Sequence, residues 1–141
     1  MAVPSNAINA QGVELQRGNG ATPETFVVVG EITQFDGPGG SATVIDVSTL
    51  QSVAKEKRAG LADEGQFTFQ MNLDPSDVQQ NALRADRAAR VLRNFRLRLT
   101  DISNTTLQFS ALVLEFKISG AVDQVVKASV TLEISGAVTG W

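Results

Sequence analysis

Two segments of the chain alternate strictly between apolar and polar residues, which is the period of half-buried β-strands. In residues 66–73 the apolar positions are Phe67, Phe69, Met71 and Leu73, and the polar positions are Gln66, Thr68, Gln70 and Asn72. In residues 126–135 the apolar positions are Ala128, Val130, Leu132 and Ile134, and the polar positions are Lys127, Ser129, Thr131 and Glu133. Each strand therefore buries one face, and its polar face meets either bulk solvent or a water-filled surface.

Further strands are predicted on both sides of these segments. Residues 26–35 are β-branched and aromatic, residues 36–40 are a dense turn signal, and residues 42–47 are β-branched again, so we expect a hairpin over 26–47. Residues 94–100 alternate as another strand. In residues 105–119 the apolar phase changes at 110–112, which predicts a bulge or a strand that changes its buried face.

A single helix is predicted over residues 75–92. Asp74 is placed as its N-cap, Pro75 at the first helical position and Asp77 in the first turn, beside the positive end of the helix dipole. A narrow apolar stripe follows at helical spacing, made of Val78, Ala82, Ala85, Ala89 and Leu92. We expect this stripe to pack on a sheet.

The remaining segments are polar or charged. Residues 1–24 contain small and polar residues with at most one short strand around Val13 and Leu15, and we interpret them as an N-terminal arm. Residues 48–65 are a long exposed connection, a kind of segment that is usually functional. The predicted organisation is an arm over residues 1–24 followed by one mostly β domain with one helix over residues 25–141.

Composition then limits the chemistry. The 141 residues include no His and no Cys, so imidazole acid–base catalysis, Cys nucleophiles and the usual zinc sites are excluded. The composition still allows an enzyme that uses only carboxylates, but no feature of the sequence points to one. A core of this size needs no disulfide or metal. The N-terminus lacks the pattern of a secretory signal and the longest apolar runs, residues 26–29 and 111–114, are too short to span a bilayer, so we expect a soluble protein.

Two motifs that could carry chemistry have simpler interpretations. Gly37-Pro38-Gly39-Gly40 lacks the Gly-Lys-Ser/Thr ending of a phosphate-binding loop and is followed by a strand, so we favour a hairpin turn. The acid pairs Asp63-Glu64 and Asp74 with Asp77 are explained by a solvated loop and a helix cap. We therefore expect no catalytic residues, no metal and no cofactor.

The net charge of −3 conceals an uneven distribution. Residues 84–98 hold six arginines and one aspartate, a charge of +5, which leaves −8 on the rest of the chain. Neither interleaved aromatics nor a groove-entering motif points to nucleic-acid reading. Arg84, Arg87, Arg90 and Arg93 are spaced three apart on the predicted helix, and Arg96 and Arg98 continue on the solvent face of the next strand. This basic stripe is either a solvated face or a subunit contact with an acidic neighbour, for which Arg84, Arg87 and Arg90 are the candidate residues, and the sequence favours neither.

The order of these elements resembles the major tail tube protein of long-tailed, non-contractile bacteriophages. The matching segments are Gly30 to Asp46 with its glycine-rich turn, Gly65 to Pro75 (Gly-Gln-Phe-Thr-Phe-Gln-Met-Asn-Leu-Asp-Pro), and the run from Gly120 to Gly136. Together they are spread over nearly the whole length of residues 25–138. The tubes of contractile injection systems, including type VI secretion, are related and share the fold.

The resemblance implies a structural virion protein, made in the host cytoplasm. Its subunit would be a β-sandwich or half-barrel flanked by one helix. Six subunits would form a ring whose inner strands close into one barrel, and the rings would stack into a tail tube that delivers the genome. The implied partners are further copies of the chain, the tape measure protein, the tail terminator and distal tail proteins, and genomic DNA that passes without specific binding. No membrane partner is implied.

The same resemblance gives the polar and charged segments expected roles. The arm and the 48–65 connection, with Lys55, Lys57 and Arg58, would make contacts between rings, and the polar strand faces would line the lumen through Gln66, Thr68, Gln70, Asn72, Ser129, Thr131 and Glu133. The lumen should not be net basic, since a basic wall would retain DNA. The alternatives are the tube of a contractile injection system or a small β-sandwich binding module, although one Trp and no Tyr give the latter few aromatic platforms.

Overall fold

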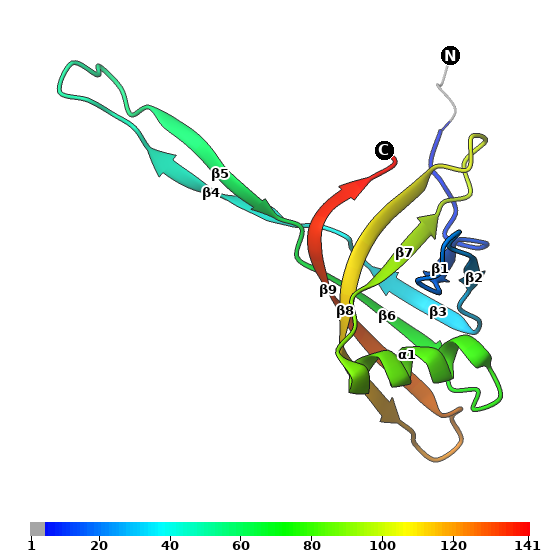
Figure 1. Cartoon of the computed structure of the whole chain (residues 1–141). Coiled ribbons are helices and arrows are strands. Elements are labelled where there is room, and N and C mark those ends of the chain that lie inside the picture. The colour runs from blue at the N-terminus through cyan, green and yellow to red at the C-terminus, as the bar shows by residue number, and fades with distance from the viewer. Residues whose placement is uncertain (1–4) are drawn as a thin grey trace.

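The computed structural model describes residues 5–141, and within them a curved antiparallel sheet and one helix form a body from which a two-stranded hairpin projects (Figure 1). The body contains β1 (Glu14–Gly18), β2 (Phe26–Val28), β3 (Ile32–Asp36), β6 (Gln66–Asn72), α1 (Val78–Ala89), β7 (Arg93–Arg98), β8 (Thr106–Ser119) and β9 (Lys127–Thr139). The hairpin consists of β4 (Ser41–Asp46) and β5 (Lys57–Asp63). The seven strands of the body follow the order β2-β1-β7-β8-β9-β6-β3. The predicted mostly β fold with one helix is confirmed.

The core fills the inner face of the curved sheet, and the alternating segments supply most of it. Phe67, Phe69 and Met71 on β6 are at most 1% exposed, and the four apolar positions predicted on β9 are all buried. The ring centroids of Phe67 and Phe109 lie 5.6 Å apart, and those of Phe35 and Phe67 lie 6.1 Å apart. Because burial of one large apolar side chain contributes about 1.5–3 kcal/mol, this aromatic cluster dominates the stability of the body.

The helix is shorter than predicted and has a different cap. It begins at Val78, because Oδ1 of Asp77 accepts hydrogen bonds from the backbone N–H groups of Gln79 and Gln80. Asp74, the expected cap, instead accepts from Ser76 in the preceding turn. The helix ends at Ala89, before Arg90 in the left-handed region with φ of 57°. The interpretation of Asp74 as N-cap and the bounds 75–92 are therefore wrong.

The predicted apolar stripe of the helix is also wrong. Val78 is 74% exposed, and the buried residues of α1 are Gln80, Leu83 and Asp86. The Asp86 carboxylate is held by Nε and Nη2 of Arg17 at 2.7 and 2.9 Å and by Nε of Arg93 at 3.1 Å. A charged residue can occupy the inner face because these two guanidinium groups, one from β1 and one from β7, neutralise it.

The expected N-terminal arm ends earlier than residue 24. β1 lies between β2 and β7 in the sheet, and Leu15 on it is 2% exposed, so residues 14–18 belong to the body. A five-residue strand that buries one leucine and one paired arginine carries too weak a periodic signal to stand out from a polar segment. Residues 1–4 of the expected arm lie outside the described residues.

The predicted hairpin over 26–47 is wrong, because β3 pairs with β6 and β4 pairs with β5. The glycine-rich segment joins the sheet to a separate hairpin, and a Cβ on Gly40 would collide with the carbonyl oxygen of Asp63. The segment around Gly40 and the segment around Asp63 approach each other so closely at this point that glycine is required. The 48–65 connection is exposed as expected, but residues 57–63 of it are β5.

The predicted change in which alternate residues of the long strand are buried is confirmed, but it occurs a few residues after the predicted position at 110–112. The register of β8 against β9 shifts between Val113 and Glu115. Before the shift Phe109, Ala111 and Val113 are buried, and after it Phe116 is the residue that packs against the core. The bulge therefore keeps apolar side chains on the inner face along the whole length of β8.

Candidate functional site: surfaces for assembly

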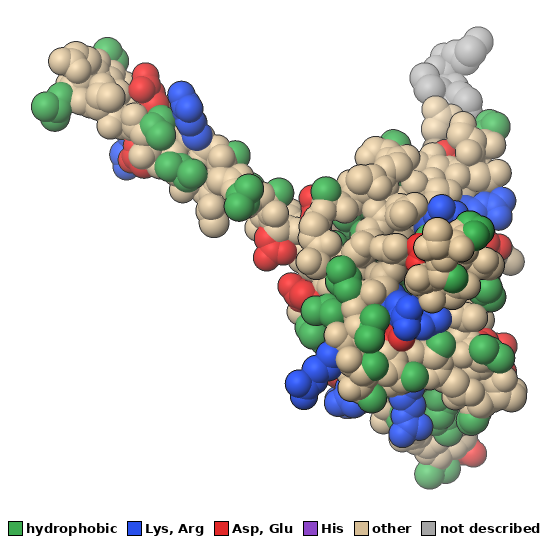
Figure 2. All heavy atoms as spheres, in the orientation of Figure 1, with side chains coloured by type: hydrophobic (Ala, Val, Ile, Leu, Met, Phe, Trp, Pro, Cys, Tyr) green, Lys and Arg blue, Asp and Glu red, His purple; other side chains and the backbone are tan. Residues whose placement is uncertain are grey.

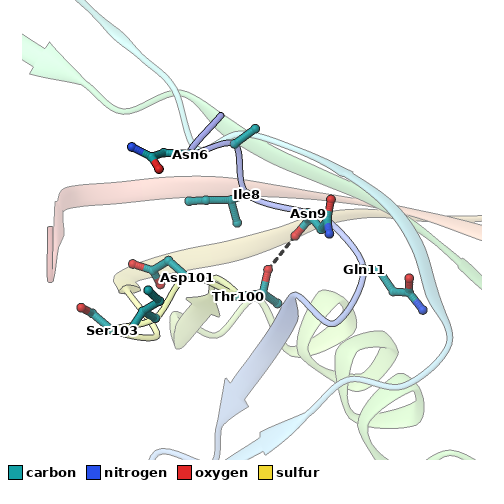
Figure 3. A pocket seen from close by; sticks show the side chains of 9 residues that line it. Asn6, Ile8, Asn9, Gln11, Thr100, Asp101 and Ser103 are labelled. Atoms are coloured by element: carbon teal, nitrogen blue, oxygen red, sulfur yellow. Dashed lines mark hydrogen bonds between the residues drawn. The ribbon is translucent and has the colours of Figure 1, made fainter. Parts of the chain in front are cut away.

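The interior and the pockets offer little chemistry. Residues 5–141 contain no group of three acidic, His or Cys side chains placed to hold a metal ion, and no helix among them is long and apolar enough to cross a membrane. A cavity of about 570 Å³ lies between the N-terminal segment and the turn after β7 (Figure 3). The Thr100 hydroxyl there donates to the Asn9 carbonyl oxygen at 2.6 Å, so this contact attaches the N-terminal segment to the body.

The acidic side chain beside that cavity is already engaged. The carboxylate of Asp101 accepts from the hydroxyl of Thr105 at 2.5 Å and from its backbone N–H at 2.6 Å. These two hydrogen bonds lower the pKa of Asp101, so it is ionised at neutral pH and is a poor general acid.

The two polar rows predicted from the sequence lie side by side. β6 and β9 are adjacent and antiparallel, with Thr68 opposite Thr131 and Gln70 opposite Ser129. At one end the side-chain amide of Gln66 donates to Oε2 of Glu133 at 2.9 Å. The structure therefore brings together all seven predicted lumen residues, which are Gln66, Thr68, Gln70, Asn72, Ser129, Thr131 and Glu133.

This polar surface extends over the two flanking strands. On β3, Gln34 is opposite Gln70 and Asp36 is opposite Thr68, and on β8, Glu115 is opposite Thr131 and Lys117 is opposite Ser129. We call the outer surface of β3, β6, β9 and the second half of β8 the polar face. Its charged residues are Asp36, Glu115, Lys117, Lys127 and Glu133, three carboxylates against two lysines. The polar face is therefore hydrated and not net basic.

Both sides of the polar face end in open strand edges. β3 is the last strand of the sheet and pairs only with β6. On the other side β7 pairs with β8 only as far as Ala111, so residues 112–119 of β8 pair with β9 alone. Unpaired backbone N–H and C=O groups along such edges are templates for pairing with another chain.

The hairpin is a long two-stranded ribbon with an apolar surface. All residues of β4 and β5 are exposed except Gly60, which is half-buried. The predicted contact residues Lys55, Lys57 and Arg58 lie on it, and Figure 2 shows basic side chains among apolar ones along this hairpin. The exposed large apolar residues of this segment are Val44, Ile45, Val47, Leu50, Val53 and Leu61. Such an exposed apolar surface is typical of a protein contact.

The predicted basic stripe divides into two groups. Three of its arginines are anchored to the body: Arg93 binds Asp86, Arg96 lies 3.8 Å above the ring of Phe26, and Nη1 of Arg98 lies 3.6 Å from Glu14. The other three are Arg84, Arg87 and Arg90, which are exposed and form no ion pair within residues 5–141. The structure does not bring this exposed group next to the hairpin lysines.

Sequence reasoning missed one feature, a cavity of about 450 Å³ between the end of α1 and β8. Its lining residues are Arg87, Ala88, Arg90, Leu112, Val113 and Leu114, and we call it the notch. Leu114 is 48% exposed, although its neighbour Val113 is buried. The signal in the sequence was the pair of leucines at 112 and 114, out of phase with the buried residues before them.

The comparisons with known proteins agree with one another. A family model described as phage tail tube, lambda-like, matches residues 6–91, which is more than half of the chain. No curated protein matches the sequence at a significant level.

Several solved structures share the fold. One is the tail of an empty gene transfer agent particle, refined with C6 symmetry (13% identity, 96% of this chain and 99% of the other covered, TM-score 0.74). Another is the SPP1 tail tube (14% identity, 96% and 80% covered, TM-score 0.71). A third is the sheath–tube complex of an extracellular contractile injection system, PVC (12% identity, 96% and 93% covered, TM-score 0.69).

Proposed function

The chain belongs to the lambda-like phage tail tube family and is a structural tube subunit of a virion tail, and on this premise we propose that six copies close into a ring that stacks into a genome-conducting tube. The observation that carries the proposal is the polar face between two open strand edges. Sixfold closure is supported by the C6 symmetry of the similar gene transfer agent tail. The function is structural and needs no catalytic residue.

The polarity of the strands allows such a ring to close. The polar face is formed by four antiparallel strands, so β8 on one side runs opposite to β3 on the other. When identical copies are related by rotation, the open edge of β8 meets β3 of the next copy in antiparallel orientation. A heterologous contact of this kind closes into a ring, and backbone pairing continues the sheet around it.

In this ring the polar face lines the lumen. Threonine, serine, glutamine and asparagine side chains hydrate the wall, and three carboxylates against two lysines make it slightly acidic. A wall without net positive charge does not release counterions from DNA, so the genome passes without being retained. The tape measure protein would occupy the same lumen before the genome.

The hairpin and the N-terminal arm are placed to join one ring to the next. The hairpin leaves the body on the side away from α1 (Figure 1), so stacked copies would bring it against the next ring. The exposed apolar side chains of its outer part, which include Val44, Leu50 and Val53, then lose contact with water, and Lys55, Lys57 and Arg58 lie in the same contact. The tail terminator and distal tail proteins would cover the contact surfaces left free at the two ends of the tube.

A contractile injection system is the second candidate, because its tube subunits share this fold with a TM-score of 0.69. The two candidates differ in whether a sheath surrounds the tube. Co-purification of the assembled tail with a sheath protein favours the contractile machine, and bare tubes favour the non-contractile one.

Electron microscopy of the purified chain at high concentration tests the proposal. We expect rings or tubes with sixfold symmetry. Protein that stays monomeric under every condition, including addition of its tail partners, contradicts it. Binding of DNA to the preformed tubes with micromolar or stronger affinity at physiological salt would contradict the inert lumen.

A further inference from the structure

The notch is an unfilled apolar and basic depression beside an open strand edge. Leu112, Val113 and Leu114 form its apolar wall at the point where β7 leaves β8. Arg87 and Arg90 from the end of α1 form its rim, and neither has an ion-pair partner within the described residues 5–141. A partner that fits this surface carries carboxylates next to apolar groups.

The register of the sheet indicates which part of the next copy reaches the notch. Asp36 pairs with Thr68, Thr68 with Thr131, and Thr131 with Glu115, so Asp36 and Glu115 lie on one row across the polar face. β3 is antiparallel to β8, so the chain that continues past Asp36 runs in the direction of residues 114, 113 and 112. In a closed ring, the segment that follows β3 of one copy therefore lies beside the notch of its neighbour.

That segment, residues 37–40, lies against the acidic junction between the body and the hairpin, because Gly39 and Gly65 form a β-bridge. The junction contains Asp63, the last residue of β5, and Glu64, which lead into β6 through Gly65, and neither forms an ion pair within the part of the chain that the structure describes. Oδ1 of Asp63 accepts only the backbone N–H of Gly65, at 2.9 Å. Figure 2 shows acidic side chains where the hairpin meets the body. Leu61, 95% exposed, lies next to them on β5.

The junction is held firmly enough to act as a docking element. Gly39 and Gly65 form a β-bridge, and a Cβ on Gly65 would collide with the Gly39 carbonyl oxygen. This close contact fixes the position of Asp63 and Glu64 relative to β3. A rigid acidic projection therefore extends from one edge of the sheet, and a basic apolar notch lies at the other.

We propose that within the ring the notch of one subunit binds the hairpin junction of the next, with Arg87 and Arg90 facing Asp63 and Glu64 and with Leu112 and Leu114 against Leu61. This inference rests on the proposed ring. The proposed contact gives the exposed arginines of the helix and the acidic junction a partner surface in the neighbouring subunit. Closure of the ring then depends on both groups.

Charge reversal tests the pairing. The notch variant is Arg87→Glu with Arg90→Glu, and the junction variant is Asp63→Lys with Glu64→Lys. Each variant alone places like charges opposite each other at every contact between a notch and a junction. We therefore expect the fraction of protein that pellets as tubes to fall by about tenfold or more relative to wild type. An equimolar mixture pairs each reversed notch with a reversed junction in alternating order around the ring. The mixture should recover tubes to within about twofold of wild type.

The control variant Arg84→Glu reverses one charge a turn earlier on α1, outside the notch, and should assemble normally. Its matched comparison is the single notch variant Arg87→Glu. Because Asp63 also accepts from Gly65, Glu64→Lys alone serves as a second junction variant, and thermal unfolding checks that every variant is folded.

The outcomes separate the two proposals. Rescue in the mixture supports the pairing, and normal assembly of either variant alone, or failure of the mixture to assemble while both variants are folded, overturns it. Wild-type protein that never forms rings overturns the ring and this inference with it. Wild-type tubes together with an unaffected notch variant overturn this inference alone.

Discussion

The body and the hairpin have similar β-rich sequences and opposite environments. In the body, the curved sheet and the helix bury fifteen apolar residues between them. In the hairpin, β-branched and aliphatic residues of the same kind are 38–105% exposed. An isolated two-stranded ribbon is at best marginally stable in water. The difference indicates that the body completes its core within one chain, whereas the hairpin completes its packing only in contact with another chain.

Removing one large side chain from each region should give the largest difference in the free energy of unfolding. Phe67→Ala should lower the free energy of unfolding by roughly 4 kcal/mol, because Phe67 is 0% exposed and contacts three other rings. Leu61→Ala in the hairpin should change it by less than about 0.5 kcal/mol, because Leu61 is 95% exposed. Urea unfolding of both monomers measures the difference, and equal losses would contradict the distinction.

The buried ion network gives the next largest effect. Asp86→Asn leaves Arg17, whose side chain is 10% exposed, without its counter-charge, and should cost roughly 3 kcal/mol. The matched control is Asp123→Asn in the exposed turn before β9, which should be nearly neutral. Thermal unfolding of the two variants compares them. A network with no stabilising role would leave both melting temperatures alike.

The junction that connects the two regions should show an intermediate effect. Gly40→Ala introduces a Cβ that collides with the Asp63 carbonyl oxygen, whereas a Cβ on Gly39 meets nothing within 4 Å. We expect Gly40→Ala to cost about 1–2 kcal/mol and to reduce tube formation, and Gly39→Ala to do neither. Unfolding and pelleting assays report the two quantities. Normal tubes from a folded Gly40→Ala variant would show that the direction of the hairpin is not important.

Removing most of the hairpin should barely change the stability of the body. Deletion of residues 50–62 removes exposed residues together with most of β5 and leaves the seven-stranded sheet intact. We expect the free energy of unfolding to stay within about 0.5 kcal/mol of wild type while stacking is lost. Calorimetry and electron microscopy test this. Loss of the fold would mean that the hairpin belongs to the core.

The smallest effect is a local pH dependence in the hairpin. The backbone N–H of Ser48 donates to Oδ1 of Asp46 at 2.9 Å, and this hydrogen bond is the main cause of the lowered pKa of Asp46. A lowered folded-state pKa means that the turn is fully stabilised above the ordinary value of about 4 and loses this stabilisation as the pH falls through the lowered pKa. NMR of the Ser48 amide should show the change below about pH 4. Asp46→Asn should abolish it.

The sequence predicted the parts of the molecule that depend on local periodicity. The core and polar faces of β6 and β9 follow from strict alternation, which needs no knowledge of the partner strand. The adjacency of the two polar rows did not follow, because Gln66 and Glu133 are 67 residues apart. Burial of Asp86 likewise depends on Arg17, 69 residues away, so an apolar stripe was the simpler prediction for the helix.

The glycine-rich segment misled the prediction for a related reason. A turn signal between two β-branched runs favours a hairpin when only neighbouring residues are considered. Here β3 finds a better partner in β6, where Phe35 is opposite Phe69, and the chain leaves the sheet instead of turning back on it. The notch was not predicted because its residues come from α1 and β8, and its apolar wall becomes accessible only where β7 ends.

Helical reconstruction of tubes assembled from the purified chain tests the central claim most directly. We expect sixfold rings in which β8 pairs with β3 of the next copy, Gln70 and Thr131 face the lumen, and the hairpin contacts the adjacent ring. Tubes in which Gln70 and Thr131 face outward, or in which the hairpin points into solvent, would contradict the assignment of both regions.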